Sequence, residues 1–177
     1  MQLLKTILSL ALAAPLLAAP PGVGDQAPDF TAKTPSGDTV KFAEVTAEGP
    51  TVLVMLRGYP GYQCPACDRQ VHDFLSNAKK FAKKNAEIVL IYPGPPADLD
   101  KRAEEFSADK NYPENFHLVL DPGYDVTNLY DLRWDAPDET AYPATFVMNP
   151  GRKVTYSLIS DSHGGRTTAA QVLKQIK

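Results

Sequence analysis

The sequence is poor in cysteine: its 177 residues hold two, Cys64 and Cys67, both in one Cys-x-x-Cys motif. There is no second motif of this kind and there are only three histidines, so a structural zinc site lacks well-spaced ligands. No run rich in lysine and arginine is present and the net charge is -3, which argues against a nucleic-acid partner. With 44% hydrophobic residues, a chain of this length is expected to fold as one domain whose core needs no disulfide staple.

The first residues have the pattern of a secretory signal. Lys5 precedes an apolar stretch from Ile7 to about Ala19, which ends in small residues. Pro15 interrupts this stretch, and it is short for a spanning helix, so an uncleaved membrane anchor is the weaker interpretation. A lipoprotein signal requires a cysteine at the end of this stretch, and the sequence has none there. We expect cleavage after residues 1–19 and a protein without stable membrane association that works outside the cytoplasm, periplasmic or secreted, where disulfides persist.

The remaining chain alternates apolar runs of strand length with amphipathic segments. We expect residues 20–27 to be a flexible leader and residues 28–177 to be one domain. Strands are predicted at 38–45, 51–56, 87–92, 117–120, 144–149 and 153–159, the last two in hairpin spacing. Helices are predicted from the cysteines to Ala82 and at 97–110, 124–132 and 167–177, the last opened by a threonine cap. This order predicts an α/β fold with a central mixed sheet flanked by helices.

The cysteines stand at the entrance of a helix. The buried strand 51–56 is followed by a loop of about seven residues, and Pro65 suits the first position of the next helix. Cys64 would then be the N-cap, where unpaired backbone N–H groups and the helix dipole favour thiolate over thiol. Cys67 lies one helical turn deeper, within reach of a disulfide. The pattern therefore predicts a reactive pair.

Other interpretations of the pair are weaker. A disulfide over three residues closes too small a loop to act as an effective staple. A copper site made of both cysteines and the distant His163 stays open, since thiolates and imidazole suit copper. A catalytically idle binding module is a further alternative, but the presence of both cysteines at a helix entrance argues against it.

Three stretches resemble the redoxin group of the thioredoxin-like superfamily, that is, peroxiredoxins of the alkyl hydroperoxide reductase/thiol-specific antioxidant type and their relatives. They are VGDQAPDFTAKTPSGDTVKF (23–42), TVLVMLRGYPGYQCPACDRQ (51–70) and YPATFVMNPGRKVTYSLISDSHGGR (142–166). The resemblance implies a thioredoxin-like fold with an N-terminal redoxin extension. Carried over to this sequence, it makes Cys64 the attacking thiol and Cys67 the resolving one. It also makes Tyr142–Pro143 a cis peptide beside the pair, and Arg166 a guanidinium that holds thiolate and peroxide oxygen together.

The sequence departs from that pattern at two positions before the cysteine. Typical peroxiredoxins have proline seven residues before the reactive cysteine and threonine or serine three before it, whereas this chain has Arg57 and Gly61. Many also have a thiolate-binding arginine where this chain has Pro143, which is the thioredoxin-type residue. Arg57 or Arg69 are possible substitutes, although a single arginine is more often a solvated surface residue.

Two mechanisms use the same two cysteines. In a peroxidase, Cys64 would reduce hydrogen peroxide or an organic hydroperoxide, and a thioredoxin-like or other dithiol would regenerate the pair. In a thiol-disulfide oxidoreductase, Cys64 would attack a disulfide of another protein. The entry motif and the hairpin favour the peroxidase, and Pro143 and the missing threonine favour the exchanger. Neither requires an organic or metal cofactor, and the sequence does not indicate an oligomeric state.

Overall fold

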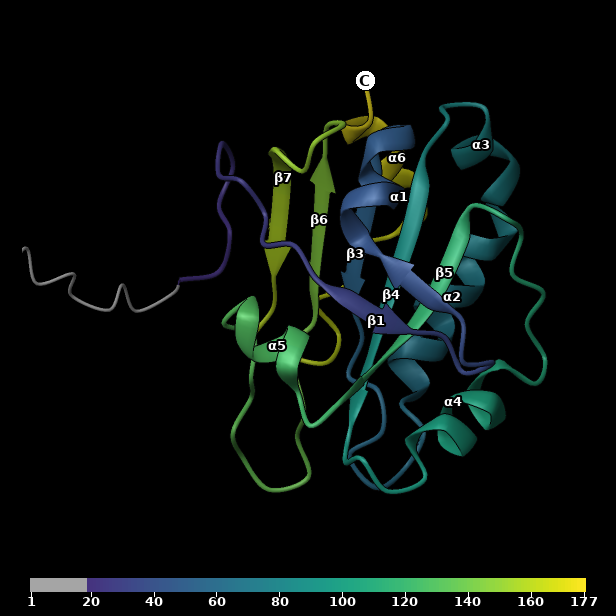
Figure 1. Ribbon diagram of the computed structural model, residues 1–177, viewed down its shortest axis with the longest axis vertical. Helices are drawn as coiled ribbons and strands as arrows, with labels where there is room; N and C mark the ends of the chain where they lie inside the picture. The colour runs from purple at the N-terminus through teal and green to yellow at the C-terminus, as the bar shows by residue number, and fades with distance from the viewer. Residues whose placement is uncertain (1–18) are drawn as a thin grey trace, which may run out of the picture.

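The computed structural model describes residues 19–177, which form a seven-stranded mixed sheet flanked by helices (Figure 1). Across the sheet the strand order is β2-β1-β5-β4-β3-β6-β7. The three central strands β3, β4 and β5 are parallel, and the other neighbours pair antiparallel. The strands are β1 (Thr31–Lys33), β2 (Thr39–Lys41), β3 (Thr51–Met55), β4 (Glu87–Gly94), β5 (Phe116–Pro122), β6 (Ala144–Met148) and β7 (Val154–Ile159). The predicted mixed α/β sheet is confirmed.

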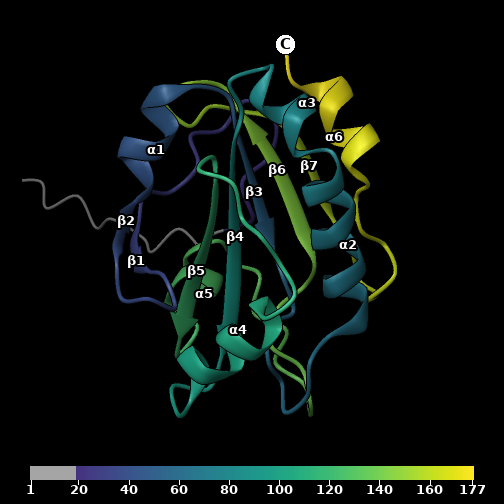
Figure 2. The ribbon, with the colours of Figure 1, turned by 90° about the vertical axis from the view of Figure 1, so that its right-hand side faces the viewer.

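Helices cover both faces of the sheet. They are α1 (Phe42–Glu48), α2 (Pro65–Ser76), α3 (Ala78–Ala82), α4 (Leu99–Ser107), α5 (Asp125–Leu129) and α6 (Ala169–Gln175). Helices α2, α3 and α6 lie together on one side of the sheet, with α1 on the other (Figure 2). Thr168 caps α6 in a reciprocal capping box with Gln171, as the threonine signal predicts. Within residues 19–177, no helix is both long and apolar enough to cross a membrane.

The sheet separates two hydrophobic cores. Alternate residues of β3 point to opposite faces, so Val52 and Val54 pack in the core beneath α2 and α6, while Leu53 and Met55 pack in the other. All five residues of β3 are buried, which explains why its sequence is one continuous apolar run. Strand β3 is therefore packed on both faces, and the loop that leaves it positions the cysteines.

The prediction of one strand over 38–45 is wrong in its second half. The chain pairs as β2 only through Lys41, and α1 begins at Phe42. The Phe42 ring stacks on Phe30 with 4.5 Å between the ring centroids, on the face of the sheet opposite α2. This packing turns the chain over the sheet where simple alternation would have continued the strand. The short strand β1, which pairs with β2, was not predicted.

The expected leader is partly bound to the sheet. Backbone hydrogen bonds of 2.9 Å join Gly24 N–H to the Val154 carbonyl and Val154 N–H to the Asp25 carbonyl. Ala27 N–H donates to the Arg152 carbonyl over 2.9 Å, and the Ala27 side chain is buried. Residues 24–27 thus lie along the start of β7, a pairing that the sequence did not predict. The expected signal segment, apart from Ala19, falls outside the described residues.

Gly58 should be essential for the turn between β3 and the cysteines. Its φ is +62°, and a Cβ atom there would collide with the backbone carbonyl of Pro93. Gly58→Ala is therefore expected to lower the free energy of unfolding by about 3 kcal/mol, from backbone strain and overpacking together. Urea denaturation of the oxidised protein measures this change. Gly164→Ala is the matched control, since a Cβ at Gly164 meets nothing within 4 Å. Equal denaturation midpoints for the two variants would show that the turn does not require glycine at position 58.

Candidate active site

Cys64 is the N-cap of α2, as its position before Pro65 predicts. Its φ and ψ are -82° and 108°, the extended conformation of an N-cap, and Pro65 is the first helical residue. The backbone N–H of Cys67 points at the Cys64 sulfur, with 3.2 Å between nitrogen and sulfur. In the reduced protein this N–H and the positive end of the helix dipole would stabilise a Cys64 thiolate.

The two cysteines form a disulfide in the structure, with 5.3 Å between their Cα atoms. Cys64 is 2% exposed and Cys67 is fully buried, so Cys64 is the one that a reagent reaches first. The Cys67 sulfur accepts a hydrogen bond from the backbone N–H of Arg57 over 3.2 Å. The sequence prediction of a pair able to form a disulfide is thus confirmed, and the two sulfurs have different surroundings.

Arg166 lies beside Cys64, although the two residues are far apart in the sequence. Its Nη2 atom is 3.9 Å from the Cys64 sulfur, its Nη1 donates to Gln70 Oε1 over 3.0 Å, and its Nε donates to the His163 carbonyl. Burial, with repulsion from Arg57 and Arg69, lowers the pKa of Arg166 to about 10. The guanidinium therefore remains positive at neutral pH, next to the sulfur where negative charge would develop.

Arg57 is buried, contrary to the expectation of a solvated surface residue. Its Nε atom donates to Glu139 over 2.7 Å, its Nη1 donates to the Tyr62 hydroxyl over 2.5 Å, and its Nη2 donates to the Asp138 carbonyl. The Thr140 hydroxyl donates to the Arg57 carbonyl. Burial alone would lower the pKa of Arg57, but the hydrogen bonds to Glu139 and Tyr62 outweigh it and raise that pKa. Arg57 is thus a permanent cation that joins the redox loop to the loop before β6.

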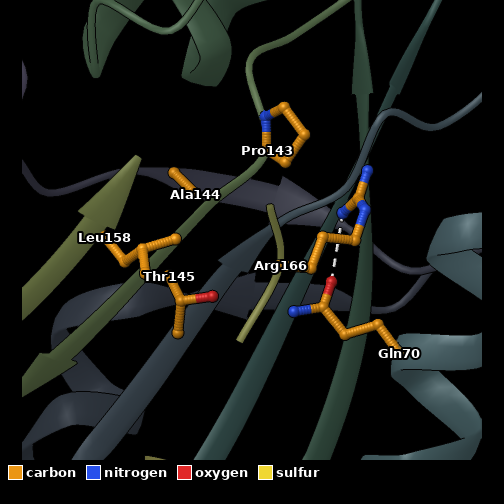
Figure 3. Close-up of a pocket in the computed structure, with 6 residues that line it drawn as sticks. All are labelled: Gln70, Pro143, Ala144, Thr145, Leu158 and Arg166. Atoms are coloured by element: carbon orange, nitrogen blue, oxygen red, sulfur yellow. Dashed lines mark hydrogen bonds between the residues drawn. The ribbon is translucent and has the colours of Figure 1, made fainter. Parts of the chain in front are cut away.

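Pro143 lines the same narrow pocket as Arg166, together with Gln70 and the first residues of β6 (Figure 3). The pocket has almost no room for water. No peptide bond in residues 19–177 is cis, so the prediction of a cis Tyr142–Pro143 bond is wrong. Tyr142 N–H donates to the Leu132 carbonyl, and the Pro143 carbonyl accepts from Ser160 N–H, each over 2.9 Å. With these hydrogen bonds on either side, the trans Tyr142–Pro143 bond continues the chain directly into the pairing of β6 with β7.

A cleft of about 300 Å³ opens beside Cys64, between the start of α2 and the end of α4. Cys64, Pro65 and Phe106 contribute to its walls, and Asp68 and Asp109 are partly exposed in it. Cys67 does not line it. This cleft is a route by which a small substrate, or a cysteine of another protein, could approach the Cys64 sulfur.

The predicted copper alternative is not supported by the geometry. His163 Nε2 lies 2.9 Å from Glu139 Oε1, and His163 does not gather with the two cysteines. In residues 19–177 the one cluster of three potential metal ligands is Asp68, His72 and Asp109. The Lys110 ammonium lies 2.7 Å from carboxylate oxygens of both aspartates, so a side-chain cation already occupies that cluster.

Gln70 and Glu139 also belong to the site, and neither was predicted from the sequence. Gln70 is buried on α2, binding Arg166 through its oxygen and the Thr167 carbonyl through its nitrogen. Glu139 contacts Arg57 and His163, which are 82 and 24 residues away. No local spacing links these positions, so a single sequence held no signal for either contact.

Comparison with known proteins agrees with this geometry. Residues 23–157 match the AhpC/TSA family. Thiol-disulfide oxidoreductase ResA of Bacillus subtilis (strain 168) is 24% identical over 74% of this chain and 64% of its own length. Peroxiredoxin Bcp of the same organism is 26% identical over 62% of this chain and 64% of its own length. The chain therefore spans less than two thirds of either curated relative.

The fold is also that of solved structures. The crystal structure of Peroxidoxin BcpB from Mycobacterium tuberculosis superposes with a TM-score of 0.67 and 25% identity, over 87% of this chain and 95% of that one. The thioredoxin-like fold implied by the sequence is thereby confirmed. Since the family match runs from the N-terminal segment to β7 and includes both cysteines, the protein belongs to the AhpC/TSA family.

Proposed function

We propose that the protein is a thiol peroxidase that reduces hydrogen peroxide or an organic hydroperoxide through Cys64. The observation that carries the proposal is the Arg166 guanidinium, 3.9 Å from the Cys64 sulfur. The partners of this guanidinium in residues 19–177 are the Gln70 side chain, the His163 carbonyl and the Cys64 sulfur, none of them a carboxylate, so its charge is free to act on an anion at the sulfur. Peroxide cleavage needs such a charge, because negative charge passes from the thiolate to the departing oxygen.

The proposed reaction has three steps. The Cys64 thiolate attacks one peroxide oxygen, so that an S–O bond forms, the O–O bond breaks, and the departing oxide takes a proton to leave as water or an alcohol. The Cys67 thiol then attacks the Cys64 sulfenic acid, forming the disulfide and releasing water. An external dithiol supplies two electrons and two protons, returns both cysteines to thiols and is itself oxidised to a disulfide.

Each residue of the site has a distinct role in this proposal. The N-terminus of α2 holds the thiolate, Arg166 stabilises the charge on sulfur and oxygen, and Gln70 orients the guanidinium by accepting its hydrogen bond. Cys67 is one turn away, so resolution needs little movement of the chain. Pro143 closes the wall behind Arg166 and keeps water out of that side.

Thiol-disulfide exchange is the alternative, and two observations favour it. ResA is among the similar proteins, and the cleft beside Cys64 is open enough for a cysteine of another protein. The reductant of the peroxidase would use the same cleft, and a thioredoxin-like dithiol fits that part of the proposal. A location outside the cytoplasm, expected from residues 1–19, would suit either reaction.

Turnover assays separate the two functions. With dithiothreitol as reductant, the purified protein is expected to consume many equivalents of hydrogen peroxide, faster than a variant with Cys64→Ser and Cys67→Ser. The protein with dithiothreitol is expected to reduce insulin disulfides no faster than dithiothreitol alone. Peroxide consumption equal to that of the double variant, together with rapid insulin reduction, would replace the peroxidase by the exchanger.

A further inference from the structure

One partly buried carboxylate bridges the surroundings of both redox sulfurs. The Glu139 side chain is 12% exposed, and its two oxygens have different partners. Oε2 accepts from Arg57 Nε over 2.7 Å, and Oε1 lies 2.9 Å from His163 Nε2. Because an ionised carboxylate only accepts hydrogen bonds, Nε2 of His163 carries the proton in this contact.

Each partner of Glu139 leads to one of the cysteines. Arg57 donates its backbone N–H to the Cys67 sulfur over 3.2 Å. His163 accepts at its backbone carbonyl from Arg166 Nε over 3.1 Å, and Arg166 reaches the Cys64 sulfur. The contacts thus run from one sulfur to the other through three loops, which follow β3, precede β6 and follow β7.

The two ends of the bridge differ in how firmly they are held. The Arg57 side chain is 3% exposed and bound at all three of its nitrogens, so it is a fixed point of the fold. The His163 side chain is 41% exposed, in a loop that contains Gly164 and Gly165. Hydrogen bonds within the loop, such as that from the Arg166 N–H to the Gly164 carbonyl, shape its turn but reach no other element. The loop that carries Arg166 therefore depends on outside contacts for its position.

We propose that Glu139 is a positioning residue, which ties the loop of His163 and Arg166 to the buried Arg57 and so holds the Arg166 guanidinium against the Cys64 sulfur. Its importance for catalysis rests on the proposed function, but the placement of Arg166 beside the sulfur does not. A guanidinium displaced by about 1 Å would lose much of its effect on the thiolate and on the departing oxygen.

Two variants test the bridge at different points. Glu139→Gln keeps the shape of the side chain and removes its charge. His163→Ala removes the outer contact, together with the packing of the His163 ring on Trp134, and leaves the Arg57–Glu139 ion pair in place, so it is expected to fold even if Glu139→Gln does not. The matched control is the His117–Glu87 pair, also 2.9 Å apart, at the amino-terminal starts of β5 and β4 and thus remote from the cysteines. His117→Ala and Glu87→Gln should leave the redox site unchanged.

The first measurement needs no peroxide. In a Cys67→Ser background, the rate of alkylation of the single thiol by iodoacetamide between pH 4 and 9 reports the titration of Cys64. We expect Glu139→Gln and His163→Ala each to shift the midpoint upward by roughly one pH unit, because a cation near the thiolate is displaced. A merely structural role would leave the midpoint of the folded protein unchanged. Unshifted profiles in both variants would overturn the proposal.

The second measurement asks whether Glu139 acts through Arg166. We expect Glu139→Gln to slow oxidation of the reduced protein by hydrogen peroxide about tenfold. This is the scale of effect expected when one electrostatic contact, that of Arg166 with the reacting atoms, is displaced but not removed. With Arg166→Met already present, Glu139→Gln should change neither the rate nor the alkylation profile by more than about twofold. Equal effects with and without Arg166 would overturn the proposal. If the alkylation profiles shift as expected in a protein that does not reduce peroxide, the positioning role stands and the peroxidase assignment fails.

Discussion

Replacing Arg166 by methionine is expected to slow the reaction of the reduced protein with hydrogen peroxide by about 10² to 10³-fold, the usual effect of removing one preorganised charge-stabilising donor. The guanidinium is the cation found beside the Cys64 sulfur, and Gln70 holds it there. Methionine keeps much of the volume of the side chain and none of its charge. Stopped-flow measurement of thiol oxidation at neutral pH gives the two second-order rate constants.

Arg69→Met is the control for a general loss of positive charge. Arg69 lies on α2 close enough to depress the pKa of Arg166, but it is exposed and has no contact with either sulfur. Its replacement is expected to change the rate by less than about threefold, the scale of a screened surface charge. An Arg166→Met rate within threefold of the unmodified protein would show that the guanidinium is not part of the reaction.

The loss of rate in Arg166→Met should not come with a loss of stability. A partly buried guanidinium without a carboxylate costs free energy of desolvation, which is also why its pKa is lowered. Removing it deletes that cost together with its hydrogen bonds to Gln70 and His163. We expect the free energy of unfolding to remain within about 1 kcal/mol of the original value, or to rise. A urea denaturation curve distinguishes a chemical defect from an unfolded protein.

Serine at each cysteine is expected to give two different defects. Cys67→Ser should react with one equivalent of hydrogen peroxide at close to the original rate and then stop, with a lasting sulfenic acid on Cys64. Cys64→Ser should lose the rapid reaction by at least about 10³-fold, because the remaining thiol is neither at a helix N-cap nor beside Arg166. The reason is the asymmetry of the pair: Cys64 borders the cleft, while Cys67 is fully buried under the Arg57 backbone.

Trapping with dimedone followed by peptide mass spectrometry identifies the oxidised residue. An adduct on Cys64 in Cys67→Ser, and none on Cys67 in Cys64→Ser, is the expected pattern. Rapid oxidation that survives in Cys64→Ser would reverse the two roles and make the buried cysteine the attacking one.

The parts of this structure that were predictable are those with local signals. The β3 strand and the start of α2 follow from a continuous apolar run, from Pro65 and from the place of Cys64 before it. Residues 38–45 misled because alternating Val40 and Phe42 fit a strand equally well, and the stacking of Phe42 on Phe30 decides where the strand ends. That contact is tertiary, and the pattern of one short segment cannot contain it.

Of the candidate site, the sequence pattern predicted the two cysteines, and the family resemblance supplied Arg166 and Pro143, which line one pocket. Arg57 was expected on the surface because arginine is seldom buried, and it is buried here since Glu139, far along the chain, neutralises it. The pairing of residues 24–27 with the start of β7 likewise joins distant parts of the chain. The expectation of a cis Pro143 came from the resemblance, and the trans bond follows the local hydrogen bonds of Tyr142 and Ser160.

The proposed reaction requires that the surroundings of Cys64 make it a peroxide-reactive thiolate. Its most direct test is the second-order rate constant for oxidation of the fully reduced protein by hydrogen peroxide, set against that of free cysteine at the same pH. We expect a constant at least about 10³ times larger, since a stabilised thiolate and a preorganised cation act together. A constant equal to that of free cysteine would rule out a peroxidase that acts through Cys64, because the helix start and Arg166 would then confer no reactivity toward peroxide.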